Sequence, residues 1–269
     1  MAEQYYLYHL DSRGVAYVTL NRPEIHNAFN DQFIEQLIEL FTKMEADQAI
    51  RLVVLTGAGR SFCAGADLNW MKSMVNYSED ENRRDSERLA TLFQTINNFT
   101  RPVIGKINGN CFGGGVGLLA VCDTCIAHDE VKLGFTEVKL GLIPAVISPF
   151  VVKKIGVSYA RSSFLSGELF SAQRAYEWGL IHKVVKSDML ENAVDKSIER
   201  HLLAGPQATI AAKRLVEQVS SMLGEDESKL TSYTCSEIAK ARISTEGQQG
   251  MQAILEKKSP PWIKSGEDV

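Results

Sequence analysis

The spacing of apolar and polar residues predicts alternating strands and helices along the first part of the chain. Apolar and polar residues alternate over 5–10 and 14–20, on either side of the turn sequence DSRG, which predicts a β-hairpin. Apolar side chains then recur every three or four residues from Phe33 to Met44, which predicts a helix capped by Asp31. The short β-branched run RLVVLTG follows and predicts the next strand.

The same alternation continues as far as about residue 158. A polar-faced helix is expected over 78–99, a strand over 103–107 and a short helix that ends at Val121. Beyond Ser158 helical patterns dominate, and we expect helices over 159–165, 172–178, 189–203, 206–222, 228–242 and 246–257. No low-complexity linker separates the two parts. The pattern favours an α/β protein that carries its site on loops at strand ends, followed by a mainly helical region.

A glycine-rich stretch between Lys106 and Glu137 is the strongest chemical signal. It reads KINGNCFGGGVGLLAVCDTCIAHDEVKLGFTE, with three adjacent glycines, an apolar run of helical length and one acid after a gap. Residues without Cβ let other groups approach the backbone N–H donors, and a helix N-terminus directs such donors at negative charge. This loop can therefore form half of an oxyanion hole.

A second loop of small residues, RSFCAGAD, follows the strand that ends in LTG. Taken alone, it also fits a tight connection between a strand and a helix. Two such loops after two different strands favour a shared role, in which Ala66 supplies a second N–H donor. A carbonyl oxygen held from both sides would be strongly polarised, as chemistry through a thioester enolate requires.

Composition excludes several classes of protein. The chain has 269 residues, of which 45% are hydrophobic and 23% charged, as in an ordinary globular protein. Its 29 basic and 33 acidic residues leave a net charge of −4, so nothing points to nucleic acid or an anionic membrane. We expect a cytoplasmic protein, because the first residues lack a signal-peptide pattern and no uncharged apolar run reaches membrane-spanning length. The five cysteines are expected to be reduced core residues.

Six segments together resemble the crotonase family of enoyl-CoA hydratases and isomerases. They are LNRPEIHNAF, RSFCAGADL, KINGNCFGGGVGL, TEVKLGLIP, LSGELFSAQRAYEWGLIHKVV and STEGQQGMQAILEKKSPPW, which span almost the whole chain in the family's order. The resemblance implies a spiral of ββα units with CoA-binding and oxyanion loops over 1–200. It also implies a helical oligomerisation region over 201–269, and a homotrimer or a dimer of trimers.

The resemblance also assigns roles to individual residues. It implies an acyl-CoA thioester as substrate, with Ala66 and Gly114 as oxyanion-hole donors and Glu137 as the acid/base. Contacts with CoA and substrate fall on a larger set: His26, Ala28, Ala64, Asp67, Leu68, Gly113 and Gly117. Since coenzyme A arrives as part of the substrate, no separate cofactor and no metal are expected.

One departure from the family pattern leaves the reaction open. Family hydratases usually carry two glutamates around a water, and Gly117 stands at the position of the first while Glu137 matches the second. Hydration requires both activation of water and protonation of the α-carbon, whereas moving a double bond requires one carboxylate. A lone Glu137 thus leans toward a Δ3-Δ2-enoyl-CoA isomerase.

A finer resemblance favours hydration. GGGVGLLAVCD and TEVKLGLIPAVISPFVV are most similar to the bacterial 3-methylglutaconyl-CoA hydratase branch. We expect that hydratase, and we hypothesise that the space left at Gly117 admits the substrate's own carboxylate or an ordered water.

Other interpretations use the same residues. The GVGLLA sequence matches a dinucleotide fingerprint, although a lone match is weak and leaves RSFCAGAD unexplained. The spacing of Cys122, Cys125 and His128 suggests a metal site but lacks a fourth ligand, so core cysteines are the preferred interpretation. A CoA-thioester-binding protein without catalysis is a third alternative. Asp123 is expected to be a buried structural acid, and Lys257 with Lys258 either a solvated helix end or a contact for CoA phosphates.

Overall fold

The computed structural model describes residues 4–224 and 226–263. Its contacts divide the chain into two units, Met1–Phe99 with Val103–Asp195, and Thr100–Pro102 with Lys196–Val269. The division falls inside helix α7 (Leu190–Leu202). A functional boundary at residue 200 stays a prediction, and the outermost residues of the two predicted domains, 1–3 and 264–269, lie outside the described part.

A long sheet of six strands forms the centre of the first unit. Its order is β1-β2-β3-β5-β7-β10, and every neighbouring pair is parallel except the hairpin of β1 and β2. The bounds are β1 Tyr6–Leu10, β2 Val15–Leu20, β3 Leu52–Gly57, β5 Val103–Ile107, β7 Thr124–His128 and β10 Lys183–Val185. Strands β3 and β5 are buried along most of their length, as expected for a parallel sheet covered on both faces.

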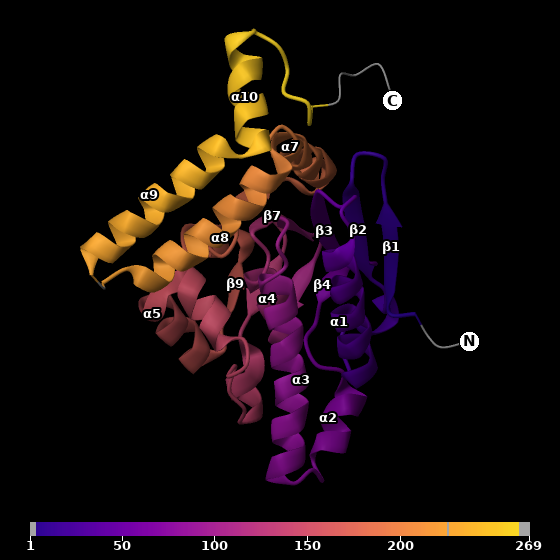
Figure 1. Ribbon diagram of the computed structural model, residues 1–269. Helices are drawn as coiled ribbons and strands as arrows, with labels where there is room; N and C mark the ends of the chain where they lie inside the picture. Colours follow the sequence, from indigo (N-terminus) through magenta and orange to yellow (C-terminus); the bar gives the residue numbers. More distant parts are fainter. Residues whose placement is uncertain (1–3, 225, 264–269) are drawn as a thin grey trace. The chain divides into compact units, whose positions relative to one another are not determined.

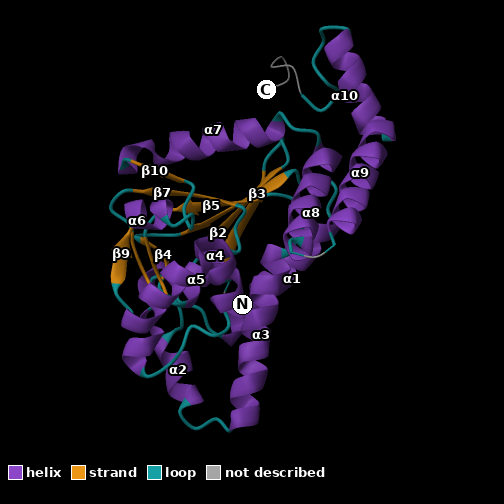
Figure 2. Ribbon diagram, turned by 90° about the vertical axis from the view of Figure 1, so that its left-hand side faces the viewer, coloured by secondary structure: helices purple, strands orange, loops and turns teal. Residues whose placement is uncertain are grey.

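A second sheet consists of four three-residue strands in the order β4-β6-β8-β9. Their bounds are β4 Ser61–Cys63, β6 Asn110–Phe112, β8 Lys132–Gly134 and β9 Leu169–Ser171. The chain passes three times from the long sheet to the short one and then into a helical segment, as β3-β4-α2, β5-β6-α4 and β7-β8-η2. Figure 2 shows β4 and β9 below the strands of the long sheet. This confirms the predicted α/β class and the spiral of ββα units.

Most helices of the first unit lie close to their predicted limits, but α5 begins well before its predicted start. They are α1 Asp31–Ala46, α2 Leu68–Met74, α3 Glu79–Asn97, α4 Gly114–Ala120, α5 Ser148–Ser166 and α6 Ala172–Glu177, with 3-10 turns η1 Pro23–Ile25, η2 Thr136–Leu140 and η3 Ser187–Met189. The helix predicted at 159–165 is the second half of α5, which is interrupted at Gly156. The cap of α1 is Asn30 and not Asp31, because the Asn30 side chain accepts a hydrogen bond from the Phe33 N–H. Helices α2 and α3 lie side by side in both views (Figures 1 and 2).

The second unit is helical. After the end of α7 it contains α8 (Pro206–Met222), α9 (Glu227–Ile243) and α10 (Thr245–Leu255). The Glu246 carboxylate at the start of α10 accepts hydrogen bonds from the Gln207 and Ala208 N–H groups at 2.9 and 2.7 Å. An acidic side chain at a helix N-terminus satisfies its free donors and complements the helix dipole. This bond fixes α10 against the first turn of α8.

The exposure of two side chains corrects two predictions. Four cysteines are buried as expected, but Cys235 is exposed on α9. Asp123 is exposed rather than buried, yet it does tie segments together, since its carboxylate accepts a hydrogen bond from the Val103 N–H at 2.7 Å. In the part of the chain that the structure describes, no helix is both long and apolar enough to cross a membrane.

Candidate active site

The first loop, residues 61–67, is held against Phe29 by backbone hydrogen bonds. The Phe29 N–H donates to the Gly65 carbonyl at 2.8 Å, and the Asp67 N–H donates to the Phe29 carbonyl at 3.0 Å. Both bonds of this parallel bridge use the backbone of Phe29, so the N–H of Ala66 between them points away from it. The bridge thus presents the Ala66 N–H on the opposite side of the loop.

A buried ion pair anchors the same loop. Arg22 donates to the Asp67 carboxylate at 2.9 Å and to the Ala28 carbonyl at 2.7 Å, and its guanidinium lies 4.7 Å from the centre of the Tyr5 ring. The second Asp67 oxygen accepts from the Asn69 N–H at 2.7 Å and caps α2. Both oxygens of Asp67 therefore hold the loop in place. The Asp67 side chain thus has a structural role, and a contact between Asp67 and CoA stays a prediction.

A left-handed turn brings the first implied CoA contacts together. His26 and Asn27 have φ values of 57° and 56°, an uncommon conformation for residues other than glycine. The Asn27 amide supports the turn by donating to the Ala58 and Ser61 carbonyls. The Ala64 N–H donates to the His26 carbonyl at 2.9 Å, which places Ala64 beside His26. The exposed His26 ring also lies 3.0 Å, from Nδ1, from the Ser61 hydroxyl.

Exposure separates the remaining implied contacts. The side chain of Leu68 is 74% exposed, whereas Ala28 is buried. Ala64 and Ala66 are half-buried. Leu68 and His26 are thus open to a ligand from solvent, and Ala28 lies beneath them as part of the packing.

The second loop, residues 112–117, needs its three glycines for close contacts. A Cβ added to Gly114 would lie 2.2 Å from Cζ of Phe29, and one added to Gly115 would lie 2.1 Å from the Cys63 carbonyl oxygen. Gly113 has a φ of 51°, which L side chains rarely adopt. A side chain is therefore excluded for a different reason at each glycine: a positive φ at Gly113, the Phe29 ring at Gly114 and the Cys63 carbonyl at Gly115.

The two loops meet at their backbones. The position that a Cβ of Gly65 would take lies 3.6 Å from the nitrogen of Gly114 and 2.8 Å from the Phe112 carbonyl oxygen. Gly114 is the first residue of α4, where an N–H has no partner within the helix. Within the described chain, neither this N–H nor that of Ala66 donates a hydrogen bond. The fold brings both predicted oxyanion donors to one place.

Glu137 lies against the second loop. It belongs to η2, and its Oε1 lies 3.2 Å from the position that a Cβ of Gly113 would take. Its Oε2 is buried and accepts no hydrogen bond from any described residue. Burial raises the pKa of the Glu137 carboxyl, and hydrogen bonding to its own backbone N–H only partly opposes this. A carboxyl with a raised pKa holds a proton more readily than an ordinary glutamate and can both accept and donate one in a reaction cycle.

The prediction of open space at Gly117 is wrong. A Cβ added there would lie 2.3 Å from Cγ2 of Ile147 and 2.9 Å from Cζ of Phe93. Both side chains are buried, so they already occupy the volume that a side chain at 117 would take. Neither a substrate carboxylate nor an ordered water fits at that position, where Gly117 packs against Ile147 and Phe93.

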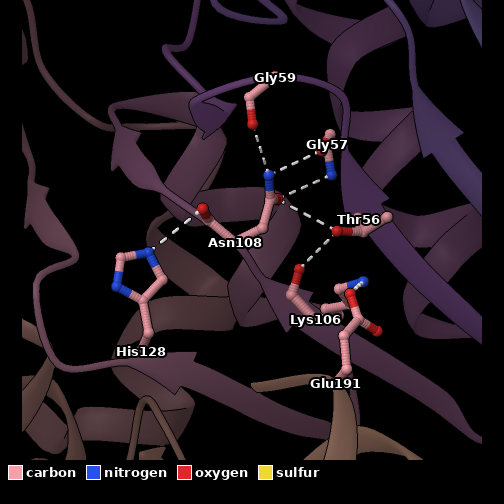
Figure 3. A network of polar contacts seen from close by, with 7 residues as sticks. All are labelled: Thr56, Gly57, Gly59, Lys106, Asn108, His128 and Glu191. Atoms are coloured by element: carbon pink, nitrogen blue, oxygen red, sulfur yellow. Dashed lines mark hydrogen bonds and ion pairs between the residues drawn. The ribbon is translucent and has the colours of Figure 1, made fainter. Parts of the chain in front are cut away.

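Asn108 ties the entrances of the two loops together, as Figure 3 shows. Its side-chain amide donates to the carbonyls of Gly57 and Gly59 at 2.7 and 3.1 Å. Its side-chain oxygen accepts from the Gly57 N–H at 3.0 Å and from the Thr56 hydroxyl at 3.1 Å. Residues 56–59 lead into the first loop and Asn108 leads into the second, so this one side chain fixes their relative positions.

Sequence reasoning missed the residues that support the site. These are Arg22, Asn27, Phe29, Phe93, Asn108 and Ile147. Two of them had a signal in the sequence: Arg22 stands just before Pro23, and Asn108 stands just before Gly109. Phe93 and Ile147 gave no signal, because their contacts with Gly117 arise only in three dimensions.

The structure also bears on the competing interpretations. Gly115 and Gly117 contact protein atoms rather than open space, so their backbones are not accessible to a pyrophosphate. Cys122 and Cys125 are buried in the core, in agreement with the preferred interpretation. Among the described residues, no group of three or more histidine, cysteine, aspartate or glutamate side chains could hold a metal ion.

Comparison with known proteins agrees with this geometry. The family described as enoyl-CoA hydratase/isomerase matches residues 11–265. The chain is 33% identical to 1,2-epoxyphenylacetyl-CoA isomerase of Escherichia coli, covering 96% of this chain and 97% of that one. It is 31% identical to 2,3-dehydroadipyl-CoA hydratase of the same organism, covering 91% and 94%. An enoyl-CoA hydratase structure from Shewanella pealeana superposes with a TM-score of 0.92 at 36% identity, covering 96% of each chain.

A spiral of ββα units with two backbone loops that meet beside a buried carboxyl defines an enzyme of the crotonase class. The chain belongs to the enoyl-CoA hydratase/isomerase family. Enzymes of this family act on acyl-CoA thioesters.

Proposed function

We propose that the protein hydrates an α,β-unsaturated acyl-CoA of the 3-methylglutaconyl-CoA class. The observation that supports it most is the meeting of three groups: the Ala66 N–H, the Gly114 N–H and the carboxyl of Glu137. In this proposal the thioester oxygen accepts hydrogen bonds from both N–H groups. Removing one such donor typically lowers the rate on the order of 10²–10³-fold.

Glu137 performs both proton transfers in the proposed reaction. Its carboxylate takes a proton from water while the water oxygen forms a bond to C3, and the electron pair of the double bond moves to the thioester as an enolate. The protonated Glu137 then returns a proton to C2, which restores the carbonyl and leaves the carboxylate free. The raised pKa of Glu137 suits this double role, since the group must hold and release a proton in one cycle.

The acyl group is proposed from the sequence resemblance around 135–152. A glutaconyl substrate carries a second carboxylate, and the space at Gly117 is closed by Ile147 and Phe93. In the proposed complex, the second carboxylate of the substrate therefore binds at a place other than the position above Gly117. His26 and Leu68, which are exposed, are proposed as contacts for the CoA part.

A Δ3-Δ2-enoyl-CoA isomerase is the second candidate. The apolar filling at Gly117 favours it, because no second carboxyl stands there to hold a water. Glu137 alone could remove a proton from C2 and return it at C4. A CoA-binding protein without catalysis is a third alternative, but it leaves unexplained why a carboxyl oxygen is buried without a partner.

Turnover assays separate these candidates. Purified protein is incubated with 3-methylglutaconyl-CoA and with a 3-enoyl-CoA, and the products are measured by mass spectrometry. Water addition to the first supports the proposal, whereas isomerisation of the second without hydration supports the alternative. Conversion of neither substrate, with binding retained, would support the non-catalytic protein.

Glu137→Gln tests the role of the carboxyl. It should remove nearly all turnover and leave binding of the acyl-CoA largely intact, because it keeps the shape but cannot transfer a proton. Glu168→Gln, at a carboxylate whose side chain is 69% exposed, is the matched control and should behave as the wild type. An active Glu137→Gln variant would exclude Glu137 from the mechanism.

The oligomeric state and location complete the proposal. We propose a homotrimer or dimer of trimers formed through the helical region 201–269, in the cytoplasm, with no cofactor apart from the coenzyme A of the substrate. Light scattering after size-exclusion chromatography tests the first point: a monomeric mass would contradict it.

A further inference from the structure

Three side chains from distant segments lie against α4 and against Gly113, the residue that precedes it. The Glu137 carboxyl lies over Gly113, and the Ile147 methyl group Cγ2 and the Phe93 ring lie over Gly117. The Gly117 N–H points to the Gly113 carbonyl at 3.4 Å, so the two glycines are one helical turn apart. Ile147 therefore lies one turn along the backbone from Gly113, the residue that the Glu137 carboxyl contacts.

Ile147 is held firmly in this place. It is 2% exposed and is the residue that precedes α5, where its carbonyl accepts hydrogen bonds from the Phe150 and Val151 N–H groups at 3.2 and 3.1 Å. Pro149 in the first turn of α5 further restricts the backbone. Phe93 is fully buried, and its ring lies 6.1 Å from that of Phe150. The wall that these side chains form over Gly117 is thus apolar and closely packed.

We propose that Ile147 is a positioning residue that restricts the site to a single carboxyl: its Cγ2 methyl group closes the space over Gly117, so that Glu137 carries out all proton transfers beside an apolar wall. This inference rests on the proposed role of Glu137. In this proposal Ile147 acts through Glu137 and does not itself touch the reacting atoms. The Ile147 side chain also explains why the absence of a side chain at Gly117 leaves no cavity, because it fills that volume.

The wall has two physical consequences. Its apolar side chains offer no hydrogen bond to the buried Oε2 of Glu137, which has no partner among the described residues. It also prevents any side chain at 117 from adding a second charge next to the first. Gly117 and Ile147 should therefore behave as one unit in mutagenesis, with strongly non-additive effects.

A double-mutant cycle tests the unit. Gly117→Glu alone places a Cβ 2.3 Å from the Ile147 methyl group and should reduce turnover on the order of 10²-fold by displacing the site. Ile147→Ala removes Cγ2 and opens that space. In Gly117→Glu with Ile147→Ala, turnover should recover to within about tenfold of the wild type, and hydration of an unbranched 2-enoyl-CoA should rise relative to isomerisation of a 3-enoyl-CoA.

Titration of Glu137 gives a readout that does not require turnover. Carboxyl NMR with labelled glutamate should show a raised pKa in the wild type, a lower one in Ile147→Ala, and two coupled titration steps in the double variant. Ile147→Val keeps Cγ2 and should retain the wild-type titration. Ile155→Ala, at a buried isoleucine within α5, is the matched control: it should lower the melting temperature without moving the pKa of Glu137.

The outcomes separate this inference from the proposed function. A Gly117→Glu variant that folds and turns over normally with Ile147 in place would overturn the inference. So would an unchanged Glu137 titration in Ile147→Ala. If the wild type turns over none of the substrates but the titrations are as expected, the proposed function is overturned. The positioning of Glu137 by Ile147 is then still supported. If the double variant does not fold, the comparison of Ile147→Ala with Ile155→Ala still decides.

Discussion

The two loops of the site offer their backbone donors in the same way but are held in place by different forces. The first loop depends on polar side chains, above all the Arg22–Asp67 ion pair and the Asn27 amide. The second loop depends on the absence of side chains, because Gly114 and Gly115 contact Phe29 and the Cys63 carbonyl directly. The first loop should therefore be sensitive to loss of charge, and the second to added volume.

Arg22→Ala should have the largest effect, because it removes one partner of a buried pair. Each side chain of the pair is 10% exposed, and breaking such a pair typically costs about 3–5 kcal/mol. Urea unfolding should show this loss, together with a fall in turnover. Arg83→Ala, which breaks an exposed pair with Asp80, is the control and should cost less than about 1 kcal/mol. Similar values for the two variants would show that the first loop does not depend on its ion pair.

Gly115→Ala tests the second loop with the addition of a single methyl group. The new Cβ would lie 2.1 Å from a backbone oxygen, which cannot rotate away as a side chain can. We expect a cost of about 3 kcal/mol, at the upper end of overpacking effects, and displacement of the Gly114 N–H. Gly141→Ala is the control, since its Cβ meets open space and only its φ of 73° adds strain, of about 1–2 kcal/mol. A Gly115→Ala protein as stable as this control would contradict the close contact.

Asn108→Ala should affect both loops at once. It leaves the backbone groups of Gly57 and Gly59 without the amide, a loss of about 1–3 kcal/mol. Because Asn108 fixes the two entrances relative to each other, turnover should fall more than stability alone explains. Ser78→Ala removes the cap of α3, away from the loops, and should cost about 1 kcal/mol without changing kcat. Equal kcat values in the two variants would remove the connecting role of Asn108.

The pH dependence of stability gives the smallest expected effect. Burial raises the pKa of Glu137 above its ordinary value of 4.5, so the folded state keeps a proton that the unfolded chain has already lost. The stabilising contribution of this carboxyl is complete below about pH 4.5 and is lost as the pH rises through the folded pKa. Glu137→Gln should therefore be more stable than the wild type at neutral pH and lose this advantage in acid. Equal stability at both pH values would contradict burial of the charge.

The local pattern of the sequence predicts much of the fold. The hairpin, α1, α3, β5 and the helices from α6 to α10 appear near their predicted places, whereas the first half of α5 was not predicted. The short sheet of β4, β6, β8 and β9 was not predicted, because three-residue strands are too short to show a period. Asn30 and Asp31 are both good caps, and only backbone geometry decides between them.

The candidate site was predictable where it depends on the backbone and unpredictable where it depends on packing. The runs of glycine and other small residues predicted both loops, and the family resemblance pointed to Glu137. The space at Gly117 could not be predicted, because Ile147, thirty residues later, fills it. Likewise the exposure of Cys235 and Asp123 follows from their places on the surface and not from residue type.

The rate at which the buried thiols Cys63 and Cys111 are alkylated can measure local opening of the short sheet. Cys63 lies at the end of β4 in the first loop, and Cys111 lies in β6 just before the second. Burial raises the pKa of Cys63 to about 12 and also raises that of Cys111, so neither forms the reactive thiolate while the sheet is closed. An alkylating reagent should modify the exposed Cys235 at once and reach Cys63 and Cys111 only when β4 and β6 separate. Since Cys122 and Cys125 are also buried, the slow labelling of Cys63 and Cys111, followed residue by residue, reports how often the two loops come apart in the native protein.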